Sequence, residues 1–160
     1  MKIIAYGSLM NRSSLESVVG RPAPLSTIVV SGWKRVFNAA FDGYAFLNLR
    51  PAADSMIEAA HFELDSTELE LFAEREEGAQ LVEVVPGFHA FVWSETYCRE
   101  LPVLRSYLDV CSHAAGGLGI NFAVGLDWPR TVVDDTKNPQ YDMFWWAQGP
   151  DLPIEPAEGQ

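Results

Sequence analysis

The sequence predicts a single α+β domain, built as a small mixed β-barrel or a strongly curled sheet with flanking helices. About six or seven short segments are rich in β-branched and aromatic residues, few segments are helical, and the two kinds do not alternate regularly. With 160 residues, 48% of them hydrophobic, the chain is long enough to bury one core. We expect the domain to span residues 1–148, and the Pro-rich residues 149–160 to form a flexible tail.

Short apolar runs that are bounded by Gly or Pro predict the strands. Asp42-Gly43 and Pro86-Gly87 predict turns between neighbouring strands. The expected strands are residues 2–6, 26–30, 33–39, 44–49, 56–64, 81–85 and 88–93.

Two helix starts are indicated by capping-box patterns, in which a capping residue is followed three positions later by Glu. These pairs are Ser13 with Glu16 and Asp65 with Glu68, and Pro102 suits the first turn of a third helix. The expected helices are residues 13–20, 65–77 and 102–115, with a short fourth helix after Pro129.

The charge of the chain excludes several classes of partner. Its 22 acidic and 11 basic residues give a formal net charge of −11, which repels nucleic acid phosphates and acidic lipids. We therefore expect no nucleic acid partner. No run of about 18 apolar residues is present, so we also expect no membrane partner and a cytoplasmic protein. Cys98 and Cys111 are expected to be reduced thiols, and the three histidines show no metal-ligand spacing, which predicts no metal site.

One carboxylate of the second expected helix occupies an apolar position. Leu69, Phe72 and Ala73 define a helix face, and Glu76 is the next member of that series at i+7. A carboxylate on such a face must be paired, hydrogen-bonded or protonated, and burial raises its pKa toward the range of a general base at neutral pH. The alternative is that Glu76 lies in the last turn of the helix and bends out to water.

Two further segments are candidates for a site. Tyr107 shares the inward face of the third expected helix with Leu108 and Cys111, although a buried Tyr most often serves packing. At the end of the first strand, Gly7 lets the backbone turn sharply after Tyr6, which leaves backbone N–H groups free to hold an anion. A simple tight turn is the other interpretation of this segment.

Together these segments resemble the γ-glutamylcyclotransferase superfamily. Its members open with a strand followed by Tyr-Gly-Ser and then Asn or Leu, which matches Tyr6, Gly7, Ser8 and Leu9. An aromatic residue about 25 positions later matches Trp33, and the family's N-x-x-P segment matches Asn48–Pro51. The family's acidic helix segment matches FAEREEG, and a later helix carries a Tyr that matches Tyr107.

The resemblance implies a cofactor-independent cyclotransferase. Such an enzyme converts a γ-glutamyl amino acid or peptide into 5-oxoproline and a free amine. The match places the general acid/base on Glu76, with Glu77 the runner-up when the following Gly is used as the anchor. It also implies that the turn from Tyr6 to Leu9 binds the substrate through the N–H groups of Gly7, Ser8 and Leu9. Tyr107 would contact the glutamyl end, and Arg50 would assist the carboxylate or form a surface salt bridge.

Two departures from the family pattern leave the leaving group open. Ala59 or Ala60 stands where a Gly is usual, and Ala79-Gln80 replaces a common Tyr. The alternatives are therefore a γ-glutamylamine cyclotransferase, or a non-catalytic module that binds a small carboxylate. A third is an interaction protein that uses an aromatic cluster, although these side chains more often serve packing. This aromatic cluster consists of Tyr141, Phe144, Trp145 and Trp146.

We expect the protein to be a monomer or a homodimer.

Overall fold

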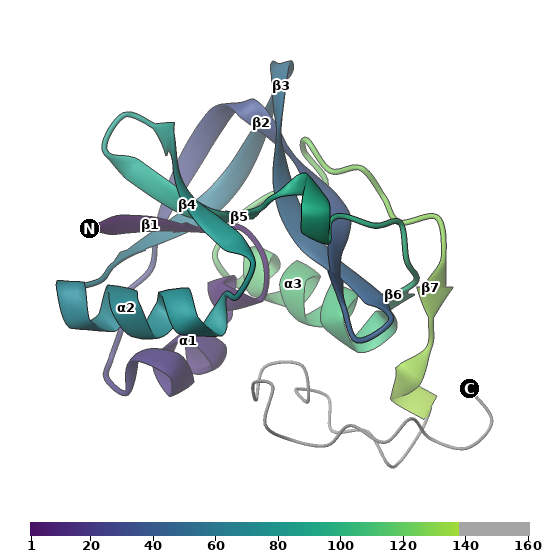
Figure 1. Ribbon diagram of the computed structural model, residues 1–160, viewed down its shortest axis with the longest axis horizontal. Coiled ribbons are helices and arrows are strands. Elements are labelled where there is room, and N and C mark those ends of the chain that lie inside the picture. Colours follow the sequence, from purple (N-terminus) through teal and green to yellow (C-terminus); the bar gives the residue numbers. More distant parts are fainter. Residues whose placement is uncertain (138–160) are drawn as a thin grey trace.

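The computed structural model describes residues 1–137, which form a five-stranded sheet, a small two-stranded sheet and three α-helices (Figure 1). The strands are β1 (Lys2–Ala5), β2 (Ser26–Phe41), β3 (Tyr44–Glu63), β4 (Ala79–Val85), β5 (Phe88–Trp93), β6 (Val103–Leu104) and β7 (Val132–Val133). The helices are α1 (Arg12–Val19), α2 (Ser66–Arg75) and α3 (Arg105–Gly117), with 3-10 turns η1 (Ser8–Met10), η2 (Glu95–Tyr97) and η3 (Asp135–Lys137). The expected tail at 149–160 and the aromatic cluster at 141–146 lie outside the described residues.

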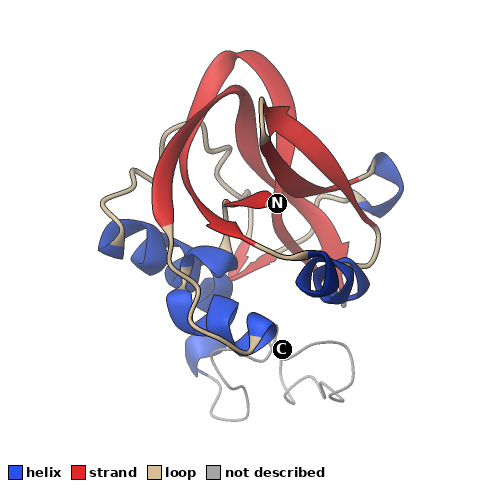
Figure 2. Cartoon of the chain, turned by 90° about the vertical axis from the view of Figure 1, so that its left-hand side faces the viewer, coloured by secondary structure: helices blue, strands red, loops and turns tan. Residues whose placement is uncertain are grey.

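The predicted α+β class is confirmed, and the large sheet has the strand order β2-β3-β1-β5-β4. Its neighbours are antiparallel except for the parallel pair β1–β5. The sheet curls strongly (Figure 2), and the indole Nε1 of Trp33 on β2 donates to the carbonyl of Val84 on β4 at 3.0 Å. No strand pairing joins these two edge strands within residues 1–137, so of the two predicted alternatives, a small barrel or a strongly curled sheet, the barrel is not confirmed.

Two long strands replace four of the expected short ones. Segments 26–30 and 33–39 belong to one strand, β2, and segments 44–49 and 56–64 belong to β3. Gly32, which the sequence suggested as an interruption, adopts a φ of 85° and is absorbed as a bulge between Ser31 and Trp33. The hairpin therefore continues past the glycine, and the bulge adds to the bend of the sheet.

The two expected capping boxes have different outcomes. Helix α1 is capped by Asn11, whose Oδ1 accepts from the N–H of Ser14 at 3.0 Å, so the capping box predicted at Ser13 is wrong. At α2 the prediction is confirmed, because Asp65 Oδ1 accepts from the N–H of Glu68 at 2.8 Å and Glu68 Oε2 accepts from that of Asp65 at 2.9 Å. Arg21 pairs with the same Glu68.

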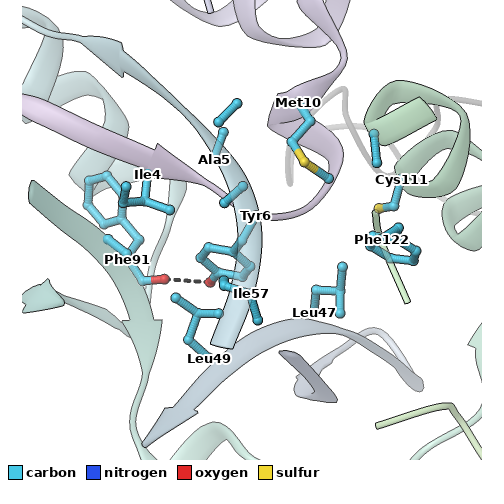
Figure 3. Packing of buried hydrophobic residues seen from close by; sticks show 14 of the residues in the cluster. Ile4, Ala5, Tyr6, Met10, Leu47, Leu49, Ile57, Phe91, Cys111 and Phe122 are labelled. Atoms are coloured by element: carbon cyan, nitrogen blue, oxygen red, sulfur yellow. Dashed lines mark hydrogen bonds between the residues drawn. The ribbon is translucent and has the colours of Figure 1, made fainter. Parts of the chain in front are cut away.

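Strand β1 is only four residues long and lies in the middle of the sheet. Beyond Ala5, side chains join the flanking strands β3 and β5 in its place. Tyr6 donates its hydroxyl to the carbonyl of Phe91 on β5 at 2.5 Å (Figure 3). Asn48 on β3 donates to the carbonyl of Trp93 at 3.1 Å and accepts from its N–H at 3.0 Å. The early end of β1 thus opens a gap in the sheet that polar side chains span.

The helices cover one end of the curled sheet (Figures 1 and 2). Phe72 of α2 packs against the rings of Phe62 on β3 and Phe91 on β5, with centroid distances of 5.8 and 6.2 Å. This contact fixes the C-terminal end of α2 beside the gap. No helix within residues 1–137 has the length and apolar character needed to span a membrane.

The start of α3 is capped by a residue distant in the sequence. Its own N-cap, Leu104, has no side chain able to accept a hydrogen bond. Asp135 accepts instead, from the N–H of Ser106 at 2.9 Å and from the Ser106 hydroxyl, and it is only 2% exposed. The segment that contains η3 is thereby attached to the helix that carries Tyr107.

Replacing Asp135 with Ala should lower the free energy of unfolding by about 2–3 kcal/mol, because two buried donors of Ser106 lose a charged acceptor. Urea denaturation measures this difference. Asp109→Ala removes an exposed acid of α3 and should change the same quantity by less than about 0.5 kcal/mol. Equal effects of the two substitutions would contradict the capping role.

Candidate active site

A cavity of about 530 Å³ opens beside the end of β1. Its wall combines the turn after β1, the end of the β2–β3 hairpin, the C-terminal end of α2, the last residues of β5, η2 and the start of α3. These segments are far apart in the sequence and meet where the sheet opens. The predicted site residues Tyr6, Gly7, Ser8, Leu9, Glu76 and Tyr107 all line this cavity.

The turn after β1 is held from several directions. The N–H of Met10 donates to the carbonyl of Gly7 at 3.0 Å, which closes the 3-10 turn. The Tyr6 carbonyl accepts from Arg35 Nε at 2.7 Å, while its hydroxyl is bonded to Phe91. The N–H groups of Ser8 and Leu9 belong to the first residues of this turn, which have no acceptor within it. Both residues line the cavity.

Gly7 lies so close to Tyr107 that a side chain there would disturb the site. A Cβ on Gly7 would lie 3.1 Å from the Tyr107 hydroxyl oxygen and 3.4 Å from Leu47 Cδ1. Tyr107 comes from the first turn of α3, and its hydroxyl accepts from the N–H of Leu47 at 3.1 Å. The ring packs edge-on against Phe46 at 4.8 Å. Burial raises the pKa of Tyr107 well above its ordinary value, so the hydroxyl is neutral.

Glu76 occupies the C-cap of α2. Its N–H still donates to the carbonyl of Phe72 at 2.9 Å, and its own carbonyl accepts from Ala79 as the chain turns at Gly78, which has a φ of 90°. The side chain is half-buried in the cavity wall. This burial raises the pKa of Glu76 to about 7, against the opposing effect of the positive charge on Arg75. The carboxyl group therefore exchanges its proton near neutral pH.

Glu76 and Tyr6 line the same cavity, and the charge of Glu76 acts on the Tyr6 hydroxyl. Burial is the main reason that the pKa of Tyr6 is raised, and the negative charge of Glu76 is the second. The expected helix face is only partly present, because Phe72 is buried but Ala73 is exposed. Glu76 is the C-cap of α2 and still donates its N–H to the Phe72 carbonyl, so its side chain leaves the helix in nearly the direction that the last turn sets.

Some predicted residues lie elsewhere. Arg50 is on an exposed part of β3, where Nη2 is 3.7 Å from Asp127 Oδ2, and it does not line the cavity. The structure therefore does not bring Arg50 to the other site residues. Ala59 and Ala60 are fully buried in the core and also do not line the cavity. The position where the family has a glycine is therefore outside the cavity wall in this protein.

Other lining residues were missed by sequence reasoning. Trp93 and Tyr97 lie beside the end of α2, where a Cβ on Gly78 would be only 2.9 Å from the Tyr97 ring. The runner-up Glu77 is exposed and also lines the cavity. The glycine after α2 was a signal for a close contact, but nothing local indicated its partner. Within residues 1–137 no three His, Cys, Asp or Glu side chains gather in a way that could hold a metal ion.

Solved structures of other proteins share this arrangement. A protein described as a γ-glutamyl cyclotransferase aligns with a TM-score of 0.63 and 12% identity, over 84% of this chain and 94% of that chain. The chain has the γ-glutamylcyclotransferase fold. A human protein described as uncharacterised aligns with a TM-score of 0.60 and 12% identity, over 84% of this chain and 94% of that one. YkqA from Bacillus subtilis aligns with a TM-score of 0.54 and 15% identity, over 72% of this chain and 48% of that one.

No family model and no curated protein sequence matches the chain. The resemblance predicted from Tyr6–Leu9 and the Glu76 segment is confirmed by the fold. The sequence identity to the protein described as a γ-glutamyl cyclotransferase and to the human protein is 12%.

Replacing Glu76 with Gln should stabilise the protein above neutral pH. The folded-state pKa of about 7 lies above the ordinary value of 4.5, so the stabilising effect of the protonated form is complete below about pH 4.5 and lost as pH rises through 7. Gln mimics the protonated acid at every pH. At pH 8 we expect a Tm about 2–6 °C above that of the wild type, with the difference vanishing near pH 4.5.

Scanning calorimetry at several pH values tests this prediction. Glu70→Gln, an exposed substitution on the same helix, is the matched control and should leave the pH dependence unchanged. A Glu76→Gln Tm that follows the wild type at every pH would show that the carboxylate is not buried.

Replacing Gly7 with Ala should displace the Tyr107 hydroxyl, because the new methyl group would lie 3.1 Å from that oxygen. We expect a loss of stability of about 1–3 kcal/mol, as for other overpacked core sites. Combining Gly7→Ala with Tyr107→Phe should recover part of the loss, since the clashing oxygen is then absent. Additive losses in the double variant would contradict the contact.

Proposed function

We propose that this protein is a cyclotransferase that converts a γ-glutamyl amino acid or peptide into 5-oxoproline and a free amine, with Glu76 as general acid/base. One observation carries the proposal. A carboxyl group whose burial raises its pKa to about 7 lines the same cavity as the turn from Tyr6 to Leu9. The fold shared with a protein described as a γ-glutamyl cyclotransferase supports the same reaction class.

The reaction needs one group that can both accept and return a proton. The substrate's α-amine is an ammonium ion at neutral pH, so the Glu76 carboxylate first removes a proton. The free amine then attacks the γ-carbonyl carbon of the same molecule and forms a tetrahedral intermediate. When the C–N bond to the leaving amine breaks, Glu76 returns the proton to that nitrogen. The carboxylate then removes a second proton from the ring nitrogen, which becomes the neutral lactam N–H, and passes it to the released amine, which leaves as an ammonium ion. The carboxylate is regenerated, and a group with a pKa near 7 suits both the uptake and the return of a proton.

The remaining cavity residues hold the substrate in a reactive conformation. Because the attack is intramolecular, the main gain comes from holding the amine close to the carbonyl. We assign the N–H groups of Gly7, Ser8 and Leu9 to the α-carboxylate or to the oxyanion. Tyr107, whose hydroxyl is fixed beside Gly7 by the Leu47 N–H, contacts the glutamyl end.

A second candidate is favoured by the charges at the cavity mouth. Asp42, Glu74 and Glu77 are exposed there, and Arg75 is the only basic residue among those that line the cavity within residues 1–137. An acidic mouth attracts a leaving group that carries a positive charge. The protein would then be a γ-glutamylamine cyclotransferase, which uses the same Glu76 chemistry.

A substrate panel tests both candidates. Purified protein is given γ-glutamyl amino acids, glutathione and γ-glutamylamines with and without a second amino group, and the release of 5-oxoproline is measured. Glu76→Gln should lower kcat/KM for the best substrate by about 10²–10⁴-fold. The wild-type kcat/KM should rise with pH through about 7, because the general base must be deprotonated.

Two control variants make the test specific. Glu70→Gln on the exposed face of α2 should leave kcat/KM unchanged. Glu77→Gln tests the runner-up position, and a loss there with full activity in Glu76→Gln would move the acid/base role to Glu77. If no compound yields 5-oxoproline although some bind, the chain is a carboxylate-binding module and the catalytic proposal is wrong.

A further inference from the structure

Arg35 is the largest side chain that is fully buried in the described part of the chain, at 0% exposure. It lies on β2, behind the turn that follows β1. Its Nε donates to the Tyr6 carbonyl at 2.7 Å, and Nη2 donates to the carbonyl of Glu58 at 2.5 Å. The guanidinium also faces the ring of Phe122 at 5.1 Å, beside Met10, and Figure 3 shows these two residues near the turn.

No acidic side chain forms an ion pair with Arg35 in the described part of the chain, and the Glu58 carboxylate acts on it only at longer range. Its Nη1 is buried with no hydrogen-bond partner within residues 1–137. The nearby Tyr6, Tyr107 and Cys111 have raised pKa values and are neutral at pH 7. Burial lowers the pKa of Arg35 only to about 10, so the guanidinium stays positive. Burying a charge whose hydrogen-bonded oxygen partners are carbonyl groups, with no carboxylate in contact, is costly.

The orientation of one peptide group directs this charge toward the cavity. The Tyr6 carbonyl points to Arg35, and in a trans peptide the N–H of the next residue points the opposite way. The Gly7 N–H is therefore directed away from the guanidinium, and both Tyr6 and Gly7 line the cavity. A positive charge and an aligned N–H dipole together favour an anion on the cavity side of the turn.

We propose that Arg35 is a positioning residue of this site, which fixes the Tyr6–Gly7 peptide and supplies, from behind the turn, the positive charge for an anionic group of the ligand. If the proposed function is correct, that group is the α-carboxylate of the γ-glutamyl substrate. The identity of the anion rests on the proposed function, whereas the preference for an anion rests on the buried charge alone.

The chain offers a matched control at the neighbouring position. Lys34 lies on the same strand but is partly exposed, and its Nζ forms an ion pair with Asp127 at 2.7 Å. Lys34→Met removes one positive charge next to Arg35 without removing a donor to the turn. It separates the effect of this particular charge from a change in net charge.

Two probes of nearly the same shape report on the charge. 5-Oxoproline carries a carboxylate at neutral pH, and 2-pyrrolidinone is the same ring without it. The affinity of each is measured by calorimetric titration for the wild type, Arg35→Met, Arg35→Lys and Lys34→Met, after circular dichroism has checked the fold. The quantity compared is the ratio of the two dissociation constants, which a general loosening of the site does not change.

We expect the wild type to bind 5-oxoproline more tightly than 2-pyrrolidinone. Arg35→Met should reduce this preference about tenfold or more, because the interaction of a partly buried charge with an anion is weakly screened. Arg35→Lys keeps the charge and should retain the preference within about threefold, while it loses one of the two carbonyl contacts. Lys34→Met should match the wild type.

The proposal is overturned if the wild type shows no preference, if Arg35→Met keeps it, or if Arg35→Lys loses it as fully as Arg35→Met. Should Arg35→Met not fold, the wild type and Arg35→Lys still decide between these outcomes. The substrate panel is independent of this test. If the wild type turns over a substrate but Arg35→Met keeps the preference for 5-oxoproline, only the role of Arg35 is rejected. If the wild type shows no turnover but Arg35→Met loses that preference, only the cyclotransferase is rejected.

Discussion

The site depends on the early end of one strand. β1 lies between β3 and β5 but stops at Ala5, while both neighbours continue. Backbone groups that lose a strand partner inside a sheet must find another, since buried unpaired groups are costly. Here Tyr6 and Asn48 supply the missing partners, and the turn from Gly7 to Met10 enters the gap. The cavity beside this turn is thus a consequence of strand length.

Two ionisable groups of opposite kind lie on either side of Tyr6, and burial affects them differently. The Tyr6 carbonyl accepts a hydrogen bond from Arg35, and burial, with a smaller contribution from the negative charge of Glu76, raises the pKa of the Tyr6 hydroxyl. Burial disfavours charge on both groups, but Arg35 starts so far above neutral pH that it keeps its proton. Glu76 starts only a few units below neutrality, so the same effect brings its pKa to the working range. One environment thus produces a permanent charge and a reversible acid.

Sequence reasoning succeeded for one of the two local capping patterns, at α2, and failed for the other, because Asn11 caps α1. The capping box at Asp65 and Glu68 involves neighbours in the chain, and it was predicted correctly. Glu76 was chosen from helix periodicity, yet the helix ends one residue earlier, and the exposed Ala73 shows that the face was drawn too wide. The choice placed the residue in the cavity because the last turn of a helix and its C-cap continue in nearly the same direction.

The distant partners were not predictable in the same way. Arg35 follows Lys34 in a strand, where two basic residues normally indicate a solvent-facing edge. Its burial depends on the Tyr6 carbonyl, on β3 and on Phe122, none of which is near it in the sequence. The curl of the sheet was predicted from composition, but composition does not determine which edge strands pair, so it left a small barrel and a curled sheet as alternatives.

Asn48 has a consequence for the energetics of binding. Its single amide group holds both the N–H and the carbonyl of Trp93, the same two groups that a neighbouring strand would hold. The wall at Trp93 is therefore ordered before any ligand arrives. A molecule entering there would not have to immobilise that part of the chain, so more of its contact energy would appear as affinity.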